Sequence, residues 1–439
     1  MLSRVETAKP VESTQLFERE QELIAPGTQT IALLSRLTIS HGEGSTLVDV
    51  DGNRYLDFNA GVSVASLGHS HPAYVRAMKA QLEQYVVGSY TSRPRLELLE
   101  LLQRLAIGKV AKAQLFSGGA ESVEAAIRLA RCYTGRSTII GFTGCFHGKT
   151  AGVLPLSDVD WKRQVGPLAA GYAIAQFPDT YRFEGTDEEC AEASLRSLRE
   201  MIATEAGGKP AAIIIEPIQG TAGNVVPPKG FLKSVREVAR ECGALLIADE
   251  MITGFGRTGA MFGCNHDGVE PDIMTVGKGM GNGYPVSALL STDEIMQAKP
   301  FSLPSASSSS YGGNPLAACA VLTTLQTILG ENLADNSRDV GTLLVEGLKG
   351  LQNKYDFIGD VRGKGLLIGM DLVSNRETKE PLAKDHCVRF FHECVNRGLI
   401  LMGYNPRVRV HPPLNLSEED ANQGLRIMDD AFAEVARGI

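Results

Sequence analysis

The chain has 439 residues, enough for about three domains of ordinary size, and 43% of its residues are hydrophobic. Its 43 basic and 51 acidic residues give a net charge of −8. This balance argues against general binding to nucleic acid or an anionic membrane, because both need a basic surface. The eight cysteines include no C-x-x-C pair, so we expect no metal site. The N-terminus lacks an apolar signal core and no apolar run is long enough for a membrane span, so we expect a soluble cytoplasmic α/β enzyme.

The first half of the chain predicts an arm, a hairpin and then a sheet. The polar first twenty-odd residues predict a mobile or surface arm, and residues 46–58 predict a hairpin that turns at Asp51-Gly52. From about residue 61 to residue 328, short apolar runs alternate with helical patterns, of which 120–132 has the clearest helical period. This alternation predicts a mostly parallel sheet. The predicted strands are 113–116, 138–142, 211–215, 244–248, 273–276 and 286–290.

After about residue 330 the pattern changes. A helix, strands at 357–361, 366–372 and 408–411, and a closing helix predict a smaller α+β domain. We therefore expect three parts: an N-terminal segment that packs with the small domain, a large domain, and the C-terminal small domain. Their predicted ranges are 1–60, 61–328 and 329–439.

Four stretches carry residues suited to chemistry, and the first is Phe116-Ser-Gly-Gly-Ala-Glu-Ser-Val123. A strand runs into two glycines and then into a helix start, where free backbone N–H groups and the helix dipole favour an anion. Glycine also lets the backbone approach a phosphate closely. The same pattern fits a plain turn from strand to helix.

The second and third stretches follow two further apolar strands. Asp249 and Glu250 stand at the end of one strand, at the edge where α/β sheets bind ligands. They also fit a structural pair of acids that caps loop amides. Lys278 follows the next strand among four glycines, where burial would lower its pKa and make it an amine nucleophile or base. A lysine that reaches into solvent is the alternative.

The fourth stretch, Gly141-Phe-Thr-Gly-Cys-Phe-His-Gly-Lys-Thr150, places an aromatic side chain next to a histidine. An aromatic there can lie flat on a planar ring, although a core phenylalanine beside a hydrogen-bonded histidine fits equally. Together the four stretches suit a ligand with a phosphate, a flat ring, a protonatable ring nitrogen and a carbonyl group. Pyridoxal 5′-phosphate has all four features.

On these motifs, the sequence resembles the class III (omega, or subgroup II) aminotransferases, which belong to the fold-type I pyridoxal-phosphate enzymes. The resemblance covers nearly the whole chain, from Asp51-Gly-Asn-Arg-Tyr-Leu-Asp-Phe58 through Leu67-Gly-His-Ser-His-Pro72 to Arg409-Val-His-Pro-Pro-Leu414. It implies the fold-type I architecture, a large domain with a mostly parallel central sheet plus a smaller α+β domain. It also implies a ping-pong exchange of an amino group between an amine or ω-amino compound and a keto acid, 2-oxoglutarate or pyruvate.

The resemblance assigns roles to individual residues. Lys278 would carry the Schiff base and move the proton, and Asp249 would pair with the ring nitrogen of the cofactor. Arg409 would hold a substrate carboxylate, although Arg407 competes for that role. Further cofactor contacts implied by the family pattern are Gly119, Ala120, Phe146, His147, Glu216, Met251 and Ser310, and further substrate contacts are Val62 and Tyr90. Ser310 matches a family threonine that reaches the phosphate of the neighbouring subunit, which implies a homodimer with shared active sites.

Departures from the family pattern bear on the substrate. Relatives that act on 4-aminobutyrate, ornithine or acetylornithine usually have a glutamate after Gln219-Gly220, where this chain has Thr221. Without that glutamate the arginine either stays open for carboxylates or swings away for a bulky apolar amine, a pattern closer to the broad amine transaminases. Ile252, in place of a common glutamine, is similar to glutamate-1-semialdehyde aminomutases, so an intramolecular aminomutase stays an alternative. A non-catalytic binding protein is a second alternative, and the intact Lys278 and Asp249 argue against it.

Overall fold

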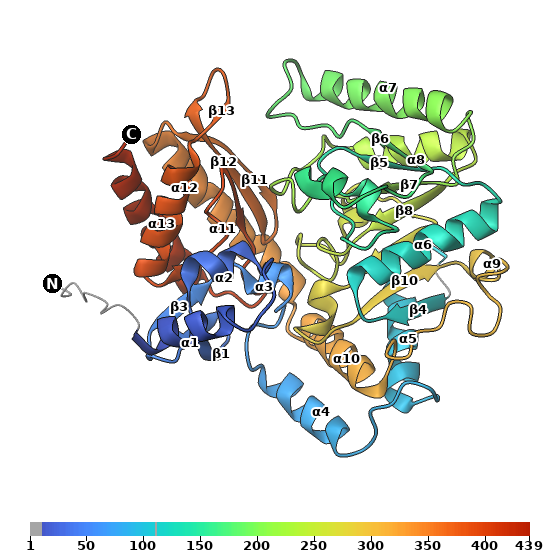
Figure 1. Ribbon diagram of the computed structural model, residues 1–439, viewed down its shortest axis with the longest axis horizontal. Helices are drawn as coiled ribbons and strands as arrows, with labels where there is room; N and C mark the ends of the chain where they lie inside the picture. The colour runs from blue at the N-terminus through green and yellow to red at the C-terminus, as the bar shows by residue number, and fades with distance from the viewer. Residues whose placement is uncertain (1–10, 110–111) are drawn as a thin grey trace.

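The computed structural model describes residues 11–109 and 112–439, and its elements form two bodies that lie side by side (Figure 1). The middle of the chain builds one body around a large sheet. The N-terminal strands and the C-terminal part build the other, so that segments from both ends of the sequence lie together (Figure 1).

The large sheet has seven strands, and its centre is parallel. Strands β5 to β9 run parallel, whereas β10 runs antiparallel to both of its neighbours. The prediction of a mostly parallel sheet is therefore confirmed. The sequence analysis missed β6, an edge strand that alternates half-buried and buried positions. The order across the sheet is β4 (Lys112–Phe116), β10 (Ser287–Ser291), β9 (Ile273–Val276), β8 (Leu245–Asp249), β7 (Ala212–Ile215), β5 (Ile139–Phe142) and β6 (Tyr172–Ala175).

Helices cover both faces of this sheet, which explains why its strands read as continuous apolar runs. Helix α6 (Gly119–Thr134) lies on one face, and α7 (Asp187–Glu205) and α8 (Phe231–Glu241) lie on the other (Figure 1). Successive strand residues alternate between the two cores: Ile213 packs under α7 and α8, and Ile214 packs under α6. Both sides of each central strand are therefore dry.

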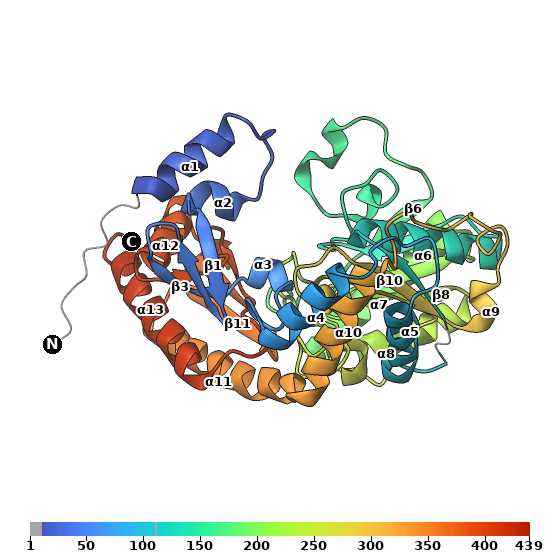
Figure 2. The same cartoon turned by 90° about the horizontal axis from the view of Figure 1, so that it is seen from below.

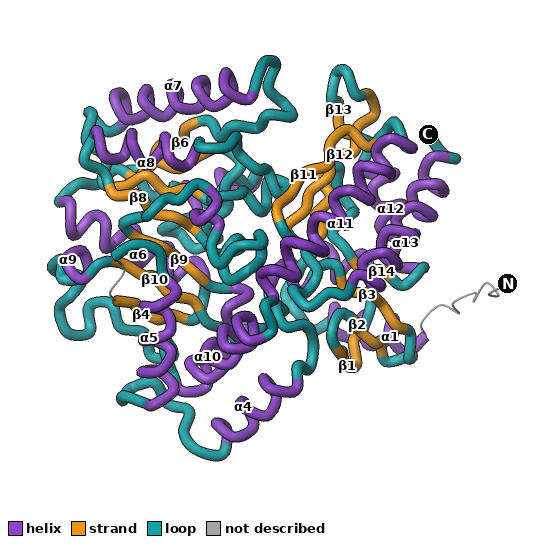
Figure 3. Tube along the Cα trace, turned by 180° about the vertical axis from the view of Figure 1, so that it is seen from behind, coloured by secondary structure: helices purple, strands orange, loops and turns teal. Residues whose placement is uncertain are grey.

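The second body contains two small sheets covered by three helices (Figures 2 and 3). The predicted hairpin is present, and its second strand pairs in parallel with β14, so Leu56 and Phe58 share a core with C-terminal residues. The domain boundaries at residues 60 and 328 stay predictions. One sheet has β1 (Ile39–Glu43), β2 (Thr46–Asp49), β3 (Arg54–Asp57) and β14 (Leu399–Ile400). The other has β11 (Ile358–Lys364), β12 (Leu367–Asn375), β13 (Glu380–Pro381) and β15 (Arg407–Val410), and the helices are α11 (Leu333–Lys354), α12 (Lys384–Asn396) and α13 (Glu418–Ala436).

The N-terminal segment is more ordered than the sequence predicts. Residues 1–10 of the expected arm lie outside the described residues, and residues 11–21 form helix α1 (Val11–Gln21), most of which lies at the surface, so this part is a surface helix. The backbone N–H groups of Glu12 and Ser13 donate to the carboxylate of Asp51 at 3.1 and 3.0 Å. The hairpin turn therefore supplies the acid that anchors the first helical turn.

Among the remaining helices, α2 packs on α12 in the second body, whereas α4 and α5 pack on α10. Within the described ranges no single helix is long and apolar enough to cross a membrane, and α10 and α11 reach that length and hydropathy only as a pair bent by 65°. The remaining α-helices are α2 (Thr30–Ser35), α3 (Ala60–Ser63), α4 (Pro72–Leu82), α5 (Arg93–Leu105), α9 (Asp293–Met296) and α10 (Pro315–Gly330). The 3₁₀ helices are η1 (Leu154–Leu156), η2 (Asp160–Gln164), η3 (Gly263–His266) and η4 (Lys278–Gly281).

Candidate active site

A cavity of about 340 Å³ lies at the carboxyl ends of the central strands, and it brings together most of the predicted site residues. Parallel strands end at one edge of their sheet, so residues that follow different strands meet there. The predicted residues in its wall are Gly119, Ala120, Phe146, His147, Asp249, Met251 and Lys278, and the wall also contains Val64, Ser117, Val123, Gly148, Gly283, Tyr284, Pro285 and Val286.

Asp249 is the fixed anion of this cavity. It is the last residue of β8, and only 1% of its surface is exposed. One carboxylate oxygen accepts from the Thr275 hydroxyl at 3.0 Å and from the Met251 N–H at 3.1 Å, and the other lies 2.6 Å from His147 Nδ1. A buried carboxylate needs such hydrogen-bond partners. They hold the Asp249 carboxylate in one orientation in the cavity wall.

His147 is the cationic partner of Asp249. Burial alone lowers the pKa of His147, but the nearby Cys145 thiol and Asp249 carboxylate raise it well above its ordinary value of 6.5. Its Nδ1 faces Asp249, whereas its buried Nε2 has no hydrogen-bond partner among the described residues. The geometry makes His147 a residue that orients Asp249, which the sequence motif alone did not show.

Lys278 lies two residues after the end of β9, at the start of η4. Its φ of 43° lies in the left-handed region, which non-glycine residues seldom adopt outside special sites. Burial lowers the pKa of Lys278 from its ordinary value of 10.5, although Asp249 and Glu216 favour the protonated form. The amine is therefore primed to act as a base or nucleophile, and the alternative of a solvated lysine is wrong.

The glycine-rich turn forms the opposite end of the cavity. Gly119 and Ala120 are the first residues of α6, where backbone N–H groups have no carbonyl partner within the helix. The Glu121 carboxylate accepts from the preceding N–H groups of Ser117 and Gly118 at 3.1 and 2.6 Å. This arrangement leaves the first two N–H groups of the helix for an anion.

Met251 and Gly148 shape this end of the cavity. A Cβ at Gly119 would lie 3.2 Å from the Met251 sulfur, and a Cβ at Gly148 would lie 2.6 Å from the Ala120 Cβ. Close packing at these points requires glycine and keeps the anion end free of side chains.

Glu216 braces the loop that carries Phe146. It follows β7, and its two oxygens accept from the N–H groups of Phe146 at 2.9 Å and Gly220 at 3.0 Å. Burial raises the pKa of Glu216, partly offset by His147. Phe146 itself is half-buried and lies in the cavity wall. Glu216 thus lies behind the cavity and holds its aromatic wall in position.

Two arginines on β15 have different surroundings. Arg407 donates to the Ala222 carbonyl at 2.6 Å and lies 3.7 and 3.8 Å from Asp179 and Asp371. Arg409 forms no ion pair among the described residues, and its charge acts on Lys278. Burial lowers the pKa of Arg409, opposed by Tyr404 and Glu216. Arg409 is therefore the arginine that is open to a ligand beside Lys278.

Besides Glu216 and Arg409, three further predicted residues lie outside the cavity wall. Val62 lies in α3, where residues 60–63 all have positive φ, and it packs against a neighbouring apolar cluster while Val64 reaches the wall. Tyr90 is 72% exposed and Ser310 is exposed. A Cβ at Gly88 would lie 3.4 Å from the Ser310 carbonyl oxygen, so these two segments lie together on one face.

The acid next to Asp249 has a structural role. Glu250 accepts from the backbone N–H groups of Gly263 and Cys264 at 2.8 and 2.7 Å, as expected of an acid that caps loop amides. Ile252 packs with Ile218 and Leu367 in a small apolar cluster rather than in the cavity wall. The two carboxylates of one dipeptide therefore have different roles.

Wall residues missed by the sequence analysis come from the edges of recognised motifs. Ser117 lies between β4 and the glycines, and Tyr284-Pro285 follow the glycine-rich turn after Lys278. Proximity to those motifs was the available signal. No group of three or more His, Cys, Asp or Glu residues with metal-binding geometry occurs in the described part of the chain.

Known proteins similar to this chain have the same architecture. The model of the family described as Aminotransferase class-III matches residues 29–432. This chain belongs to the class III aminotransferases. The acetylornithine aminotransferase of Methanothermobacter thermautotrophicus is 33% identical over 97% of this chain and 100% of that protein. The isoleucine 2-epimerase of Lentilactobacillus buchneri is 34% identical over 92% of this chain and 91% of that protein.

A solved structure supports the same assignment. The amine transaminase from an uncultivated Pseudomonas species, in its PLP-bound form, superposes with a TM-score of 0.88 and 31% identity over 94% of this chain and 99% of that one. The fold is that of the fold-type I enzymes, and the cofactor of this class III aminotransferase is pyridoxal phosphate. These similarities do not favour the aminomutase alternative.

Proposed function

We propose that this aminotransferase moves an amino group between an amine or ω-amino compound and a keto acid, 2-oxoglutarate or pyruvate, by a ping-pong mechanism. One observation carries the proposal: Lys278 and Asp249 line one cavity, and Arg409, which has no ion-pair partner among the described residues, lies close enough for its charge to act on Lys278. The amine transaminase in the structural comparison supports an amine as one substrate.

The residues of the cavity fit pyridoxal phosphate. The anion end at Gly119 and Ala120 suits its phosphate, Phe146 and Met251 suit its ring, and Asp249 suits its ring nitrogen. The buried His147 Nε2 is a donor without a partner in the same wall. When bound, the cofactor supplies a carbonyl carbon for amino exchange and a ring that accepts electrons.

The side chains then divide the work. Lys278 holds and moves a proton at its Nζ, since burial lowers its pKa toward the range useful for a base. Asp249 provides a fixed negative charge that favours a protonated ring nitrogen, and His147 keeps that charge in place. These groups are buried, and the lower dielectric of a buried site strengthens their electrostatic effects relative to water.

Arg409 is the proposed carboxylate-binding residue. Its guanidinium can form a bidentate pair with the carboxylate of a keto acid or an amino acid. Thr221 supplies no charge to neutralise it, and Arg407 is engaged by Asp179, Asp371 and the Ala222 carbonyl. An open arginine favours partners that carry a carboxylate.

A homodimer with shared active sites accounts for the exposed predicted residues. Tyr90 and Ser310 lie on one face with other exposed apolar side chains, including Val87 and Tyr311, which are 53% and 75% exposed. Exposed apolar clusters of this kind mark interaction surfaces. We propose that a second copy covers this face and that Ser310 and Tyr90 complete its cofactor and substrate sites.

We also propose a cytoplasmic location. All eight cysteines are free, including those that are fully buried. Reduced thiols are typical of proteins from reducing compartments.

A panel of donors and acceptors tests the proposed activity. We expect amine or amino-acid donors to yield carbonyl products only when pyruvate or 2-oxoglutarate is present. Double-reciprocal plots of initial velocity against donor concentration, at several acceptor concentrations, should be parallel lines. Turnover of glutamate 1-semialdehyde without an acceptor would instead indicate an aminomutase. Loss of chirality in a single amino acid without an acceptor would indicate a racemase or epimerase. Either result would overturn the two-substrate proposal.

A further inference from the structure

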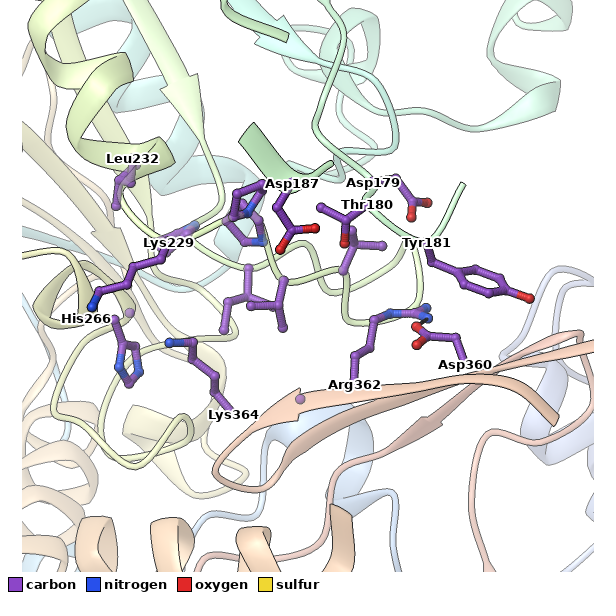
Figure 4. Close-up of a pocket in the computed structure, with 18 of the residues that line it drawn as sticks. Asp179, Thr180, Tyr181, Asp187, Lys229, Leu232, His266, Asp360, Arg362 and Lys364 are labelled. Carbon is purple, nitrogen blue, oxygen red and sulfur yellow. Dashed lines mark hydrogen bonds and ion pairs between the residues drawn. The ribbon is translucent and has the colours of Figure 1, made fainter. Parts of the chain in front are cut away.

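A second cavity, of about 480 Å³, lies between the two bodies and shares no wall residue with the cofactor cavity (Figure 4). One side is formed by loops that follow β7 and β8, with Lys229 and His266. The other side is formed by α11 and β11, with Lys349 and Lys364. Small-molecule sites commonly have this volume and lie where two structural units meet.

Three lysines in this wall have no charge partner. Lys229, Lys349 and Lys364 form no ion pair or side-chain hydrogen bond within the described ranges, although each lines the cavity. Figure 4 shows Lys229 and Lys364 at one end of the cavity, beside His266. Burial and Lys364 lower the pKa of His266 from 6.5, so the imidazole is neutral at pH 7. Its Nε2 lies 2.9 Å from the Thr258 hydroxyl, which leaves Nδ1 for a ligand.

Most acids in the wall are already engaged. Asp267 accepts from the N–H groups at the start of α8, and Asp360 pairs with Arg362 at 2.6 Å. Asp179 lies 3.7 Å from Arg407. Asp187, in the first turn of α7, is the remaining acid. Asp267, like Asp187, has no cationic partner among the described residues, so the three unpaired lysines exceed the unpaired acids of the wall by one positive charge.

We propose that this cavity binds a small oxyanion with at least two negative charges, a polycarboxylate or a phosphate ester. Lysines from both bodies converge on the cavity, so one multivalent anion can pair with both sides at once. The floor of the cavity begins at Pro217, directly after Glu216, so the bound anion would lie behind the loop that braces the cofactor site. This proposal does not depend on which amine the enzyme uses.

Calorimetric titration of the holoenzyme at low salt, with citrate and inorganic pyrophosphate as probes, tests the site. We expect one anion per chain to bind. Lys364→Ala and Lys229→Ala should each weaken binding about tenfold or more, the loss typical of one charge-assisted contact. Lys233→Ala, an exposed lysine on α8 outside the cavity, should leave the affinity unchanged. Binding of citrate alone would assign a polycarboxylate, and binding of pyrophosphate alone would assign a phosphate compound.

An Arg409→Ala holoenzyme separates this site from the active site. Retained binding in that variant supports the second site, whereas binding lost there and kept in Lys364→Ala would place the anion at the active site and overturn the proposal. Absence of binding by both probes would also overturn it. Lys229 is exposed, so Lys229→Ala keeps the test valid if the half-buried Lys364 variant folds poorly.

Discussion

The large sheet and the small C-terminal sheet contribute to one site in different ways. The large sheet delivers Asp249 and Lys278 from the ends of two neighbouring parallel strands. Buried hydrogen bonds hold Asp249, and Lys278 lies at the start of η4. The small sheet delivers Arg409 from β15, and it lacks an ion-pair partner. With the roles proposed above, the groups for proton transfer come from one body and the group for substrate choice comes from the other.

The largest expected effect on activity comes from a residue of the large sheet. Lys278→Ala should reduce transamination by about 10⁴-fold or more, because no other lysine lines the described cavity wall. Steady-state rates with a good donor measure the loss, and Lys233→Ala is the control. Residual activity within about tenfold of the parent would show that another group serves as the base.

Substitutions of the adjacent acids Asp249 and Glu250 distinguish a catalytic role from a structural one. Asp249→Asn should lower kcat by about 10²–10⁴-fold, since it removes the charge that faces His147. Glu250→Gln should leave kcat within a few-fold but destabilise the fold by about 1–3 kcal/mol, because it weakens the loop caps at Gly263 and Cys264. Kinetics together with urea unfolding separate the two effects, and equal kcat losses would contradict the assignment.

The two arginines test the contribution of the small sheet. Arg409→Ala should raise KM for keto acids by about 10–100-fold and have a smaller effect on simple amines without a carboxylate. Arg407→Ala removes contacts with Asp179 and Asp371 instead and should change this selectivity little. Equal losses with both classes of substrate in Arg409→Ala would contradict the carboxylate role.

Two glycines of α11 test how tightly the bodies are joined. A Cβ at Gly341 would overlap the backbone of Gly365, which itself abuts the loop at Arg257, so Gly341→Ala should destabilise the protein by about 1–3 kcal/mol. Gly350 has open space around it, and Gly350→Ala should stabilise the helix by about 0.5–1 kcal/mol. Thermal unfolding of both variants measures the difference, and a stabilising Gly341→Ala would show that this junction is loose.

The smallest expected effect is a pH dependence at the junction. Burial, Arg409, Arg257 and Lys278 hold the pKa of His411 well below its ordinary 6.5, so the folded state keeps it neutral. As pH falls below 6.5 the unfolded chain binds the proton and the folded chain does not, so stability falls by up to about 1.4 kcal/mol per pH unit. The pKa of His147 is raised in the folded state, so the stability that its protonation contributes is fully present below pH 6.5 and does not change in this range.

A second titration isolates this effect. Urea midpoints of the parent and of His411→Gln at pH 7.5 and 5.5 should show a smaller acid-induced loss in the variant. An identical loss would show that His411 is not responsible.

The strand ends of the large sheet were predictable because consecutive apolar residues mark strands buried on both faces. Asp249, at the end of one such strand, and Lys278, two residues after Val276, therefore marked the site edge. Sequence alone could not choose between Arg407 and Arg409, because residues two apart on a strand share a face. Only the neighbours from distant segments, such as Asp179 and Ala222, distinguish them.

Two other features could not be predicted from the sequence because they depend on tertiary contacts. Helix α1 depends on Asp51, which lies far away in the sequence. The left-handed turn at residues 60–63 contradicts local preference, because valine seldom adopts a positive φ and Val62 has a φ of 65°. Tertiary contacts override local preferences at both places, and no sequence pattern records those contacts.

The most direct test of the central claim is the absorbance spectrum of the purified protein loaded with pyridoxal phosphate. The account predicts a visible band that disappears on addition of an amino donor and returns on addition of pyruvate or 2-oxoglutarate, with Lys278→Ala unable to complete the cycle. A protein that shows no band after loading, or a band that amines and amino acids leave unchanged, would contradict it.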